Sequence, residues 1–294
     1  MADFLQQVVS GLASGGIYAS LALALVLIHR ATGVINFAQG EMATFTTYIA
    51  WTLTANHGWP YWPAFFFTLL FAFVGGVAVH RAVIAPIERG SVLTIVIVTI
   101  GLLLTLNGLV TWIWGGDPKA LENPFGARTI DIGGVVISVS DIGTIVVSIG
   151  IVILLWAFFR FTKVGLALRA SAVNPHESRL VGVRVSWMLG LGWGFAAMLG
   201  AVAGLLSAPV VSLDPNLMQA ILIYAFAAAV LGGIDSPAGA VVAGLVLGVM
   251  LNLLGVYVDF VGADMRLPAA MLIILVVLLV RPQGLFGKPV VRRV

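Results

Sequence analysis

The sequence predicts an all-α polytopic membrane protein, and three features of its composition lead to this prediction. Of the 294 residues, 61% are hydrophobic and only 9% are charged, whereas soluble domains rarely exceed about 50% apolar residues. Apolar runs of about 20 residues recur along the chain, and this is the length that a helix needs to cross a bilayer. No polar stretch exceeds about 25 residues, so we expect one transmembrane domain over residues 1–294.

The apolar runs divide the chain into about eight to nine transmembrane segments. They cover roughly residues 4–28, 40–55, 62–83, 92–114, 142–159, 187–206, 217–231, 240–257 and 267–280. Residues 217–231 are few for a crossing, so we expect a tilted span or a half-helix there, and broken or re-entrant helices elsewhere are compatible with this pattern. Pro209 is expected to end the sixth segment.

Small residues recur at positions where helices could pack closely. The first segment contains Gly11-x-x-x-Gly15, and the segment 240–257 contains Gly244-x-x-x-Gly248. Such spacing lets two helix backbones approach each other in a membrane. Two asparagines, Asn107 and Asn252, lie deep in apolar segments, where hydrogen bonds between helices are their expected role.

The distribution of Lys and Arg predicts which side of the membrane each loop faces. Basic residues are retained preferentially in the cytoplasm. Placing residues 163–185 inside puts 12 of the 15 basic residues inside, and only Lys119, Arg128 and Arg266 outside. The N-terminus is then outside, the C-terminus is inside, and the loop 115–140 is extracytoplasmic, with a hairpin expected in TIDIGGVVISVS. If one segment is re-entrant, the side of the N-terminus changes. The net charge of +3 is thereby explained without a nucleic-acid partner.

Several chemistries are excluded by what the sequence lacks. Cysteine is absent, which rules out disulfides and thiolate metal sites. No phosphate-binding G-x-x-x-x-G-K-[ST] motif is present, so we do not expect the chain to hydrolyse ATP. The four histidines, His29, His57, His80 and His176, are scattered, so neither a metal site nor a cofactor is expected. The chain is therefore predicted to be no enzyme.

The polar segment GLALRASAVNPHESRLVGVRV, residues 165–185, is unusual because it carries Arg169, Glu177 and Arg179 between two apolar segments. Asn174 can cap a helix that begins at the next residue, a proline, and Glu177 lies three residues after the cap. Gly182 would end this helix after roughly two turns. The segment is either a short cytoplasmic helix that docks a soluble partner or a plain solvated loop.

A second set of polar residues interrupts the apolar pattern. Asn36, Gln39 and Glu41 follow the first segment, and polar groups at membrane depth persist when they are paired or line water. They either border a translocation path or cap the next helix, with Glu41 in its first turn. Asp235 holds a similar position in GGIDSPAG, residues 232–239, which resembles GVINFAQG, residues 33–40. The two octapeptides suggest two structural repeats with broken helices.

Three of these motifs together resemble a known family over nearly the whole chain. The opening GLASGGIYASLALALVLIHRATGVINFAQGEMATFTTYIA, the polar segment and the late AFAAAVLGGIDSPAGAVVAGLVLG are similar to LivH-type permeases of branched-chain amino acid ATP-binding-cassette (ABC) importers. That family usually has His where this chain has Gln39, and Gly where it has Asp235. These two differences leave the substrate open.

The resemblance implies a larger machine in the bacterial inner membrane. Its expected partners are a second, homologous LivM-like permease, two cytoplasmic ABC ATPase subunits, an extracytoplasmic substrate-binding protein and membrane lipid. The polar segment 163–185 would be the coupling segment, with the following residues in contact with or positioned for an ATPase: Gly165, Arg169, Ala170, Glu177, Arg179 and Gly182. The substrate would be a branched-chain or related hydrophobic amino acid.

Other functions remain compatible with the residues alone. A urea or short-amide ABC importer would use the same scaffold. An ion-coupled secondary transporter would need ionisable groups in the membrane, for which Glu41 and Asp235 are the candidates. A gated channel or a structural membrane protein is a further alternative.

Overall fold

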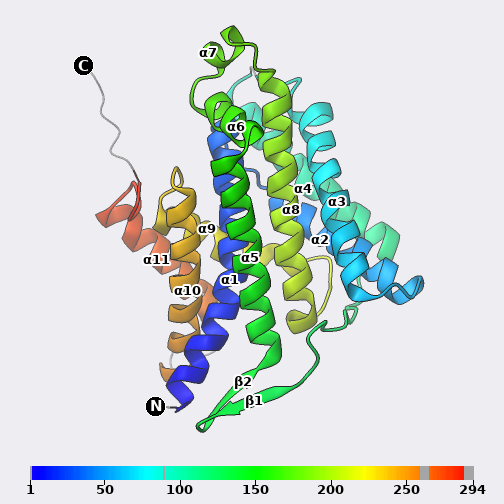
Figure 1. Cartoon of the computed structure of the whole chain (residues 1–294), viewed down its shortest axis with the longest axis vertical. Helices are drawn as coiled ribbons and strands as arrows, with labels where there is room; N and C mark the ends of the chain where they lie inside the picture. The colour runs from blue at the N-terminus through cyan, green and yellow to red at the C-terminus, as the bar shows by residue number, and fades with distance from the viewer. Residues whose placement is uncertain (1, 89, 259–264, 288–294) are drawn as a thin grey trace.

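The structure is a computed structural model that describes residues 2–88, 90–258 and 265–287. The described residues form eleven α-helices, two π-helical turns and one β-hairpin (Figure 1). The helices are α1 (Ala2–Thr32), α2 (Gln39–Trp51), α3 (Tyr61–Val79), α4 (Val92–Trp114), α5 (Val139–Phe161), α6 (Lys163–Val173), α7 (Pro175–Leu180), α8 (Val185–Val211), α9 (Leu217–Gly232), α10 (Pro237–Tyr257) and α11 (Arg266–Val280). The π-helical turns η1 (Thr52–Asn56) and η2 (His80–Ile84) extend α2 and α3, and the strands are β1 (Thr129–Ile132) and β2 (Val135–Ser138).

The predicted all-α polytopic class is confirmed. Six helices in the described residues are long and apolar enough to cross a membrane: α1, α3 with its π-turn, α4, α5, α8 and α10. Two further apolar helices, α9 and α11, have 16 and 15 residues, and α2 has 13 before its π-turn. Length therefore marks six crossings, whereas the hydropathy pattern predicts eight to nine.

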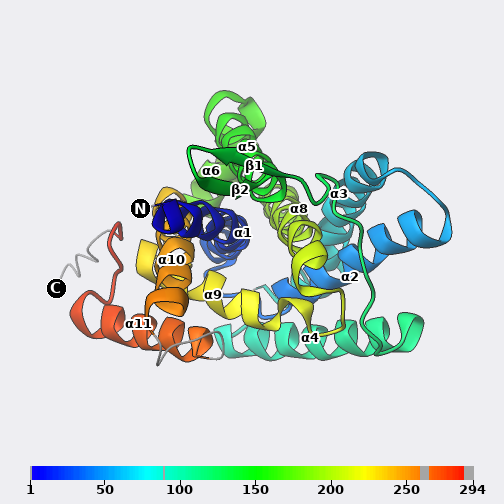
Figure 2. The same cartoon turned by 90° about the horizontal axis from the view of Figure 1, so that it is seen from below.

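Helices α1 and α8 form the centre of the bundle. Within an apolar stretch of 18 residues in each helix, 78% of the residues of α1 and 72% of those of α8 are buried. The corresponding shares are 11% for α4 and 17% for α5. Figure 2 shows α4 and α11 along one edge of the molecule, outside α2 and α9. The outer helices expose apolar side chains, as expected of surfaces in contact with lipid or with another membrane protein.

The two glycine motifs meet each other across the interface of α1 and α10, which confirms the predicted close packing. A Cβ added to Gly11 would lie 2.6 Å from the Cα of Val249, and one added to Gly248 would collide with the backbone of Gly15. Gly244 is equally constrained, because an added Cβ would lie 2.6 Å from a Cα of α1. At these positions only glycine permits the observed backbone separation.

Polar side chains join the same two helices near their extracytoplasmic ends in the predicted topology. The Nδ2 atom of Asn252 donates hydrogen bonds to the backbone carbonyl and to the side-chain Oε1 of Gln7, at 2.8 and 2.9 Å. The predicted role of Asn252 in interhelical hydrogen bonding is therefore confirmed.

Helix α8 differs from the prediction because it continues through Pro209 to Val211. Proline cannot donate the hydrogen bond that the carbonyl of residue i−4 normally accepts. Here that carbonyl belongs to Leu205, and it accepts a hydrogen bond of 3.2 Å from the hydroxyl of Tyr61 instead. Tyr61 begins α3, so a contact from a distant part of the chain satisfies the group that the proline leaves free.

The polar segment also differs from the prediction, because it forms two helices rather than one short helix. Helix α6 covers Lys163–Val173 and precedes the expected short helix, α7, which begins at Pro175. Figure 1 shows α6 and α7 at one end of the molecule and the N-terminus and the hairpin at the other. The hairpin is confirmed as an antiparallel pair with Thr129 opposite Ser138. The loops 115–140 and 163–185 thus lie at opposite ends, as predicted.

The close crossing of α1 and α10 predicts that Gly248→Ala destabilises the protein. Alanine gains about 1 kcal/mol of helix propensity over glycine, but overpacking a tight site costs about 1–3 kcal/mol. Gly101→Ala in α4 is a matched control, because nothing lies within 4 Å of its added Cβ. In detergent, we expect the Tm to fall for Gly248→Ala and to stay equal or rise for Gly101→Ala. An unchanged Tm for both variants would contradict the packing described.

Candidate functional site

The hydrogen bonds of Asn36 shape the break between α1 and α2. Its Oδ1 accepts a hydrogen bond from the N–H of Ala38 at 3.0 Å, and its backbone carbonyl accepts one from the N–H of Gln39 at 3.3 Å. The residue that caps α2 is Ala38, which has no side-chain cap, so Asn36 shapes the turn rather than acting as the predicted cap. Asn36 is 1% exposed, and its bonding satisfies a polar group that burial would otherwise penalise.

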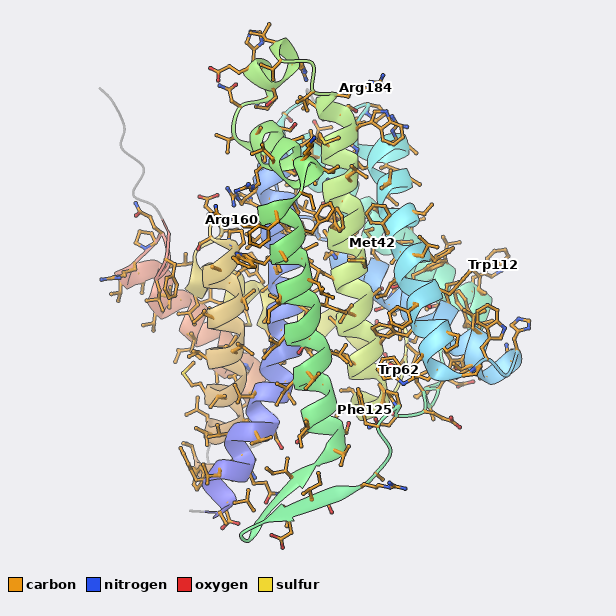
Figure 3. The ribbon with its side chains drawn as sticks, in the orientation of Figure 1. Met42, Trp62, Trp112, Phe125, Arg160 and Arg184 are labelled. Atoms are coloured by element: carbon orange, nitrogen blue, oxygen red, sulfur yellow. The ribbon has the colours of Figure 1, made fainter. Side chains whose placement is uncertain are left out.

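Figure 3 places this break deep in the molecule. Met42, in the first turn of α2, lies between the level of Arg184 at one end and that of Trp62 toward the other. Helix α1 passes beyond this level before the chain returns to begin α2 (Figure 1). The first turn of α2 therefore begins at membrane depth, as the sequence predicts for a broken helix.

Gln39 fastens the start of α2 to α8. Its Nε2 donates to the carbonyl of Ala196 at 2.9 Å, and its Oε1 accepts from the Nδ2 of Asn36 at 3.3 Å. The side chain has no exposed surface. Gly200 provides the space, because a Cβ there would lie 2.7 Å from the Nε2 of Gln39. Gln39 therefore holds the two helices together at the break.

Glu41 is buried and is linked to α4. It is 3% exposed, and its Oε2 accepts a hydrogen bond from the Nδ2 of Asn107 at 3.4 Å. The same Nδ2 is 3.0 Å from the carbonyl of Pro215, which precedes α9. Asn107 thus connects α4 with α2 and with the α8–α9 loop, which confirms its predicted role in interhelical bonding. The position of Glu41 in the first turn of α2 favours its negative charge.

Asp235 lies apart from this cluster. It belongs to the loop between α9 and α10, and its side chain is 66% exposed. Its Oδ1 is 3.7 Å from the Nε2 of His29, in the last turn of α1. The contacts of Asp235 are not shared with Glu41. The structure therefore brings Asn36, Gln39 and Glu41 together, whereas Asp235 lies near the end of α1.

The corner between α5 and α6 is tightly fixed. Gly165 packs so closely on the last turn of α5 that an added Cβ would lie 2.6 Å from the Cα of Phe159. Thr162 caps α6, because its Oγ1 accepts from the N–H of Gly165 at 2.9 Å, and its hydroxyl also donates to the carbonyl of Phe158 at 2.7 Å. Thr162 precedes the motif that we examined in the sequence, although a threonine between two helical segments is a recognisable cap.

Helix α7 presents an exposed surface beyond this corner. Its predicted cap is confirmed, since the Oδ1 of Asn174 accepts from the N–H of Glu177 at 3.3 Å. Glu177 and Arg179 are exposed. Gly182 has a φ of 85°, a left-handed conformation that glycine adopts readily and that ends the helix as predicted.

Two apolar residues at the end of α7 are also highly exposed. Leu180 is 75% exposed and Val181 is 79% exposed, at the end of the molecule where the charged residues gather. Exposed apolar side chains rimmed by charged ones are typical of protein-binding surfaces. Sequence reasoning based on charge missed these two residues, although two large apolar side chains inside a polar stretch were a visible signal.

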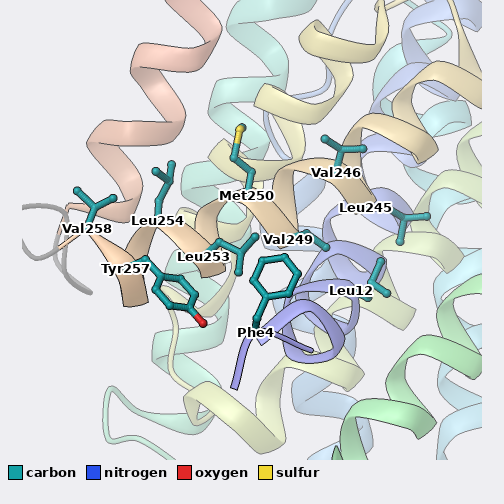
Figure 4. A pocket seen from close by; sticks show the side chains of 10 residues that line it. All are labelled: Phe4, Leu12, Leu245, Val246, Val249, Met250, Leu253, Leu254, Tyr257 and Val258. Atoms are coloured by element: carbon teal, nitrogen blue, oxygen red, sulfur yellow. The ribbon is translucent and has the colours of Figure 1, made fainter. Parts of the chain in front are cut away.

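Two further cavities lie along the sides of α10. One, of about 530 Å³, is lined by Phe4 and Leu12 of α1 and by apolar residues of α10 (Figure 4). Apart from the hydroxyl of Tyr257, its side chains carry no polar group, so it suits apolar matter rather than a polar solute. The other, of about 680 Å³, lies between α1, α5, α6, α8 and α10, and Arg30, Arg160 and Arg169 line it. Arg169, predicted in the coupling segment, thus lines a cavity.

Within the described residues, no group of three or more His, Cys, Asp or Glu side chains has a geometry suited to a metal ion. The features that do stand together are a broken helix with a buried carboxylate at membrane depth, and a rigidly held exposed helix at one end. A broken helix with buried polar groups among apolar membrane-spanning helices is typical of membrane transport proteins.

Comparison with known proteins establishes the family. Residues 7–280 match the family described as branched-chain amino acid transport system / permease component, so the chain belongs to this family. It is a multi-pass protein of the inner membrane. The permease protein BraD of the high-affinity branched-chain amino acid transport system of Pseudomonas aeruginosa is 32% identical, over 99% of this chain and 98% of BraD.

Two further comparisons concern the sequence and the fold. The corresponding permease protein LivH of Salmonella typhimurium is 30% identical, over 99% of this chain and 98% of LivH. Among solved structures, PsaBC from Streptococcus pneumoniae in complex with Fab aligns with a TM-score of 0.51, covering 95% of this chain and 92% of that one. Its 16% identity makes this a likeness of fold alone. The resemblance read from the motifs is confirmed.

The contacts of Gln39 predict that Gln39→Leu destabilises the protein. The variant leaves the buried amide of Asn36 without its partner and removes the bond to α8, at a cost of about 1–3 kcal/mol. Gln219→Leu is the control, because Gln219, in the first turn of α9, is exposed and its side chain bonds to Asn216, the residue before the helix, at 2.7 Å. Unfolding in detergent should show a lower Tm for Gln39→Leu alone. Equal losses in both variants would contradict the proposed fastening of α2 to α8.

Proposed function

We propose that this chain is one transmembrane subunit of an ABC importer for branched-chain or related hydrophobic amino acids. The proposal draws its substrate class from the curated relatives, whose names state branched-chain amino acid transport. The single structural observation that carries it is α7, which is exposed, capped at its start and joined through α6 to the fixed corner at Gly165. Such a helix suits a subunit that receives motion from outside the membrane.

In the proposed topology the chain crosses the membrane nine times. The helices α1, α2, α3, α4, α5, α8, α9, α10 and α11 are the crossings, with α2, α9 and α11 as short or tilted ones. The N-terminus and the hairpin are extracytoplasmic, and α6, α7 and the end of α11 are cytoplasmic. The arrangement in Figure 1 supports this order, because α7 and the hairpin lie at opposite ends.

The cytoplasmic partners are two ABC ATPase subunits, one of which receives α7. Leu180 and Val181 supply the apolar contact, and Glu177 and Arg179 supply its charged rim. Gly165 and Gly182 set the two ends of the coupling segment, while Ala170 lies exposed on α6. A second, LivM-like permease completes the membrane part, and a substrate-binding protein delivers the amino acid from outside. ATP-driven closure of the ATPases then biases the permease between two states.

The substrate path passes the break before α2. Asn36 and Gln39 act there as positioning residues, since both are fully engaged in hydrogen bonds at the break. Glu41 is the group that faces the path, where its carboxylate can accept a hydrogen bond from a passing ammonium group. Asp235, paired with His29 at the end of α1, marks the cytoplasmic exit of the path.

From the exposed surface of α7, we predict that Glu177→Arg or Leu180→Asp prevents association with the ATPase subunits without unfolding the permease. The first variant reverses the charge of the rim, and the second puts a carboxylate into the apolar contact. The measurement is co-purification of tagged permease with its ATPases. Arg128→Glu, exposed at the opposite end beside the hairpin, is the matched control. A full ATPase complement on both α7 variants would refute the role of α7.

Reconstitution tests the function itself. Proteoliposomes that contain both permeases and both ATPases should accumulate leucine only with ATP inside and the binding protein outside. Uptake that persists without ATPases and follows a proton gradient would instead establish ion-coupled transport. Urea uptake at the leucine rate would move the substrate class to short amides.

In the same assay, Glu41→Ala should lower leucine uptake about tenfold or more while the complex still assembles, because the variant removes a charge-assisted contact on the path. Asp131→Asn, in the hairpin outside the membrane, is the control and should keep wild-type uptake. Wild-type uptake by Glu41→Ala would remove Glu41 from the path.

A further inference from the structure

The cavity lined by Arg30, Arg160 and Arg169 is not part of the proposed substrate path. Its walls come from α1, α5, α6, α8 and α10, and its volume is about 680 Å³. Away from the arginines the lining is mostly apolar and includes Leu23, Val152, Ile153, Trp156, Val241 and Val242. The cavity therefore combines a basic end with an apolar body.

The order of residues along each helix shows which end is basic. On α1, Arg30 follows Leu23 by roughly 10 Å of helix, toward the end where α6 lies. On α5, Arg160 likewise follows Val152 and Trp156 toward the same end, and α6 adds Arg169 above them. On α10, which runs the other way, Val241 and Val242 follow the start of the helix. Arg30 and Arg160 thus lie toward the end of the cavity where α6 adds Arg169, and the apolar residues extend away from that end.

The arginines have no acidic partner among the described residues. The two carboxylate contacts found there, Asp235 with His29 and Glu88 with His80, involve histidines instead. The Nε atom of Arg169 is buried and makes no hydrogen bond in the structure. Three arginines line this one cavity, and a guanidinium group is well suited to bind phosphate.

Exposed apolar side chains lie along the cavity. Ile153 of α5 is 56% exposed and Val242 of α10 is 46% exposed. In Figure 3, Arg160 lies near the upper end of α5, on the side of α10. Trp156, 59% exposed, adds an aromatic ring of the kind that favours the membrane interface. An acyl chain can enter from this surface while its headgroup stays beside the arginines.

We propose that this cavity binds one anionic phospholipid of the leaflet on the α6 and α7 side, with its phosphate held by Arg30, Arg160 and Arg169. Basic pockets between transmembrane helices are a known mode of recognition for anionic headgroups. Because α1, α5, α6 and α10 all contribute to the walls, the lipid joins the central helix to the corner that carries α7. The binding does not depend on which solute the protein transports.

The test measures lipid binding to the purified full-length chain in detergent, with fluorescent phosphatidylglycerol and phosphatidylcholine as probes. We expect the wild type to prefer phosphatidylglycerol by about tenfold or more, since each basic residue near a membrane contributes about 1 kcal/mol to anionic lipid binding. The triple variant Arg30→Gln, Arg160→Gln, Arg169→Gln should lose this preference. Arg281→Gln, a basic residue at the end of α11 that does not line the cavity, should keep it.

A second measurement locates the lipid on the wild-type chain and does not need the variant to fold. Phosphatidylglycerol with a photoreactive group in its acyl chain should crosslink to residues 152–160 and 238–246, and phosphatidylcholine should not. Equal affinity for the two lipids, or crosslinks confined to other helices, would overturn the proposal. Crosslinking of Ile153→Cys or Val242→Cys to the second permease in the assembled complex would also overturn it, because a protein would then cover the cavity. The chain contains no other cysteine.

Discussion

The backbone contact between α1 and α10 is the constraint on which the rest of the structure depends. Lipid is as apolar as leucine, so helices in a membrane gain little by hiding apolar side chains and associate through close packing instead. Gly11, Gly15, Gly244 and Gly248 provide that packing along the helix that forms the centre of the bundle. Glycines of α8 do the same against α2 and α3, as Gly200 does at Gln39. The polar break can be buried because these contacts fix the helices around it.

Burial of polar groups at the break has a consistent pattern. Asn36 and Gln39 satisfy each other and the neighbouring backbone, whereas Glu41 shares one amide donor, Asn107, with a backbone carbonyl. A fully paired group is rigid, whereas a carboxyl group with a single long hydrogen bond of 3.4 Å is more readily re-paired. In the proposed substrate path, this difference separates Asn36 and Gln39, which position the break, from Glu41, which faces the solute.

Local signals in the sequence predicted much of this fold. The predictions that failed concern features that depend on contacts between distant segments of the chain. The fourth apolar run matches α4 at both ends, the cap at Asn174 is in place, and both glycine motifs meet a partner helix. The predicted end of α8 was wrong because the hydroxyl of Tyr61, far away in the sequence, donates the hydrogen bond that Pro209 cannot donate. The arginine-lined cavity was likewise invisible, because its three basic residues come from separate segments that only the folded chain brings together.

The corner at Thr162 and Gly165 makes α6 a lever arm. Eleven residues of helix extend about 16 Å from that corner, so a tilt of about 10° there displaces the start of α7 by about 3 Å. Because an added Cβ at Gly165 would lie 2.6 Å from the Cα of Phe159, α6 has little room to slide along the end of α5. If α7 receives an ATPase as proposed, this corner passes a displacement of α7 on to α5.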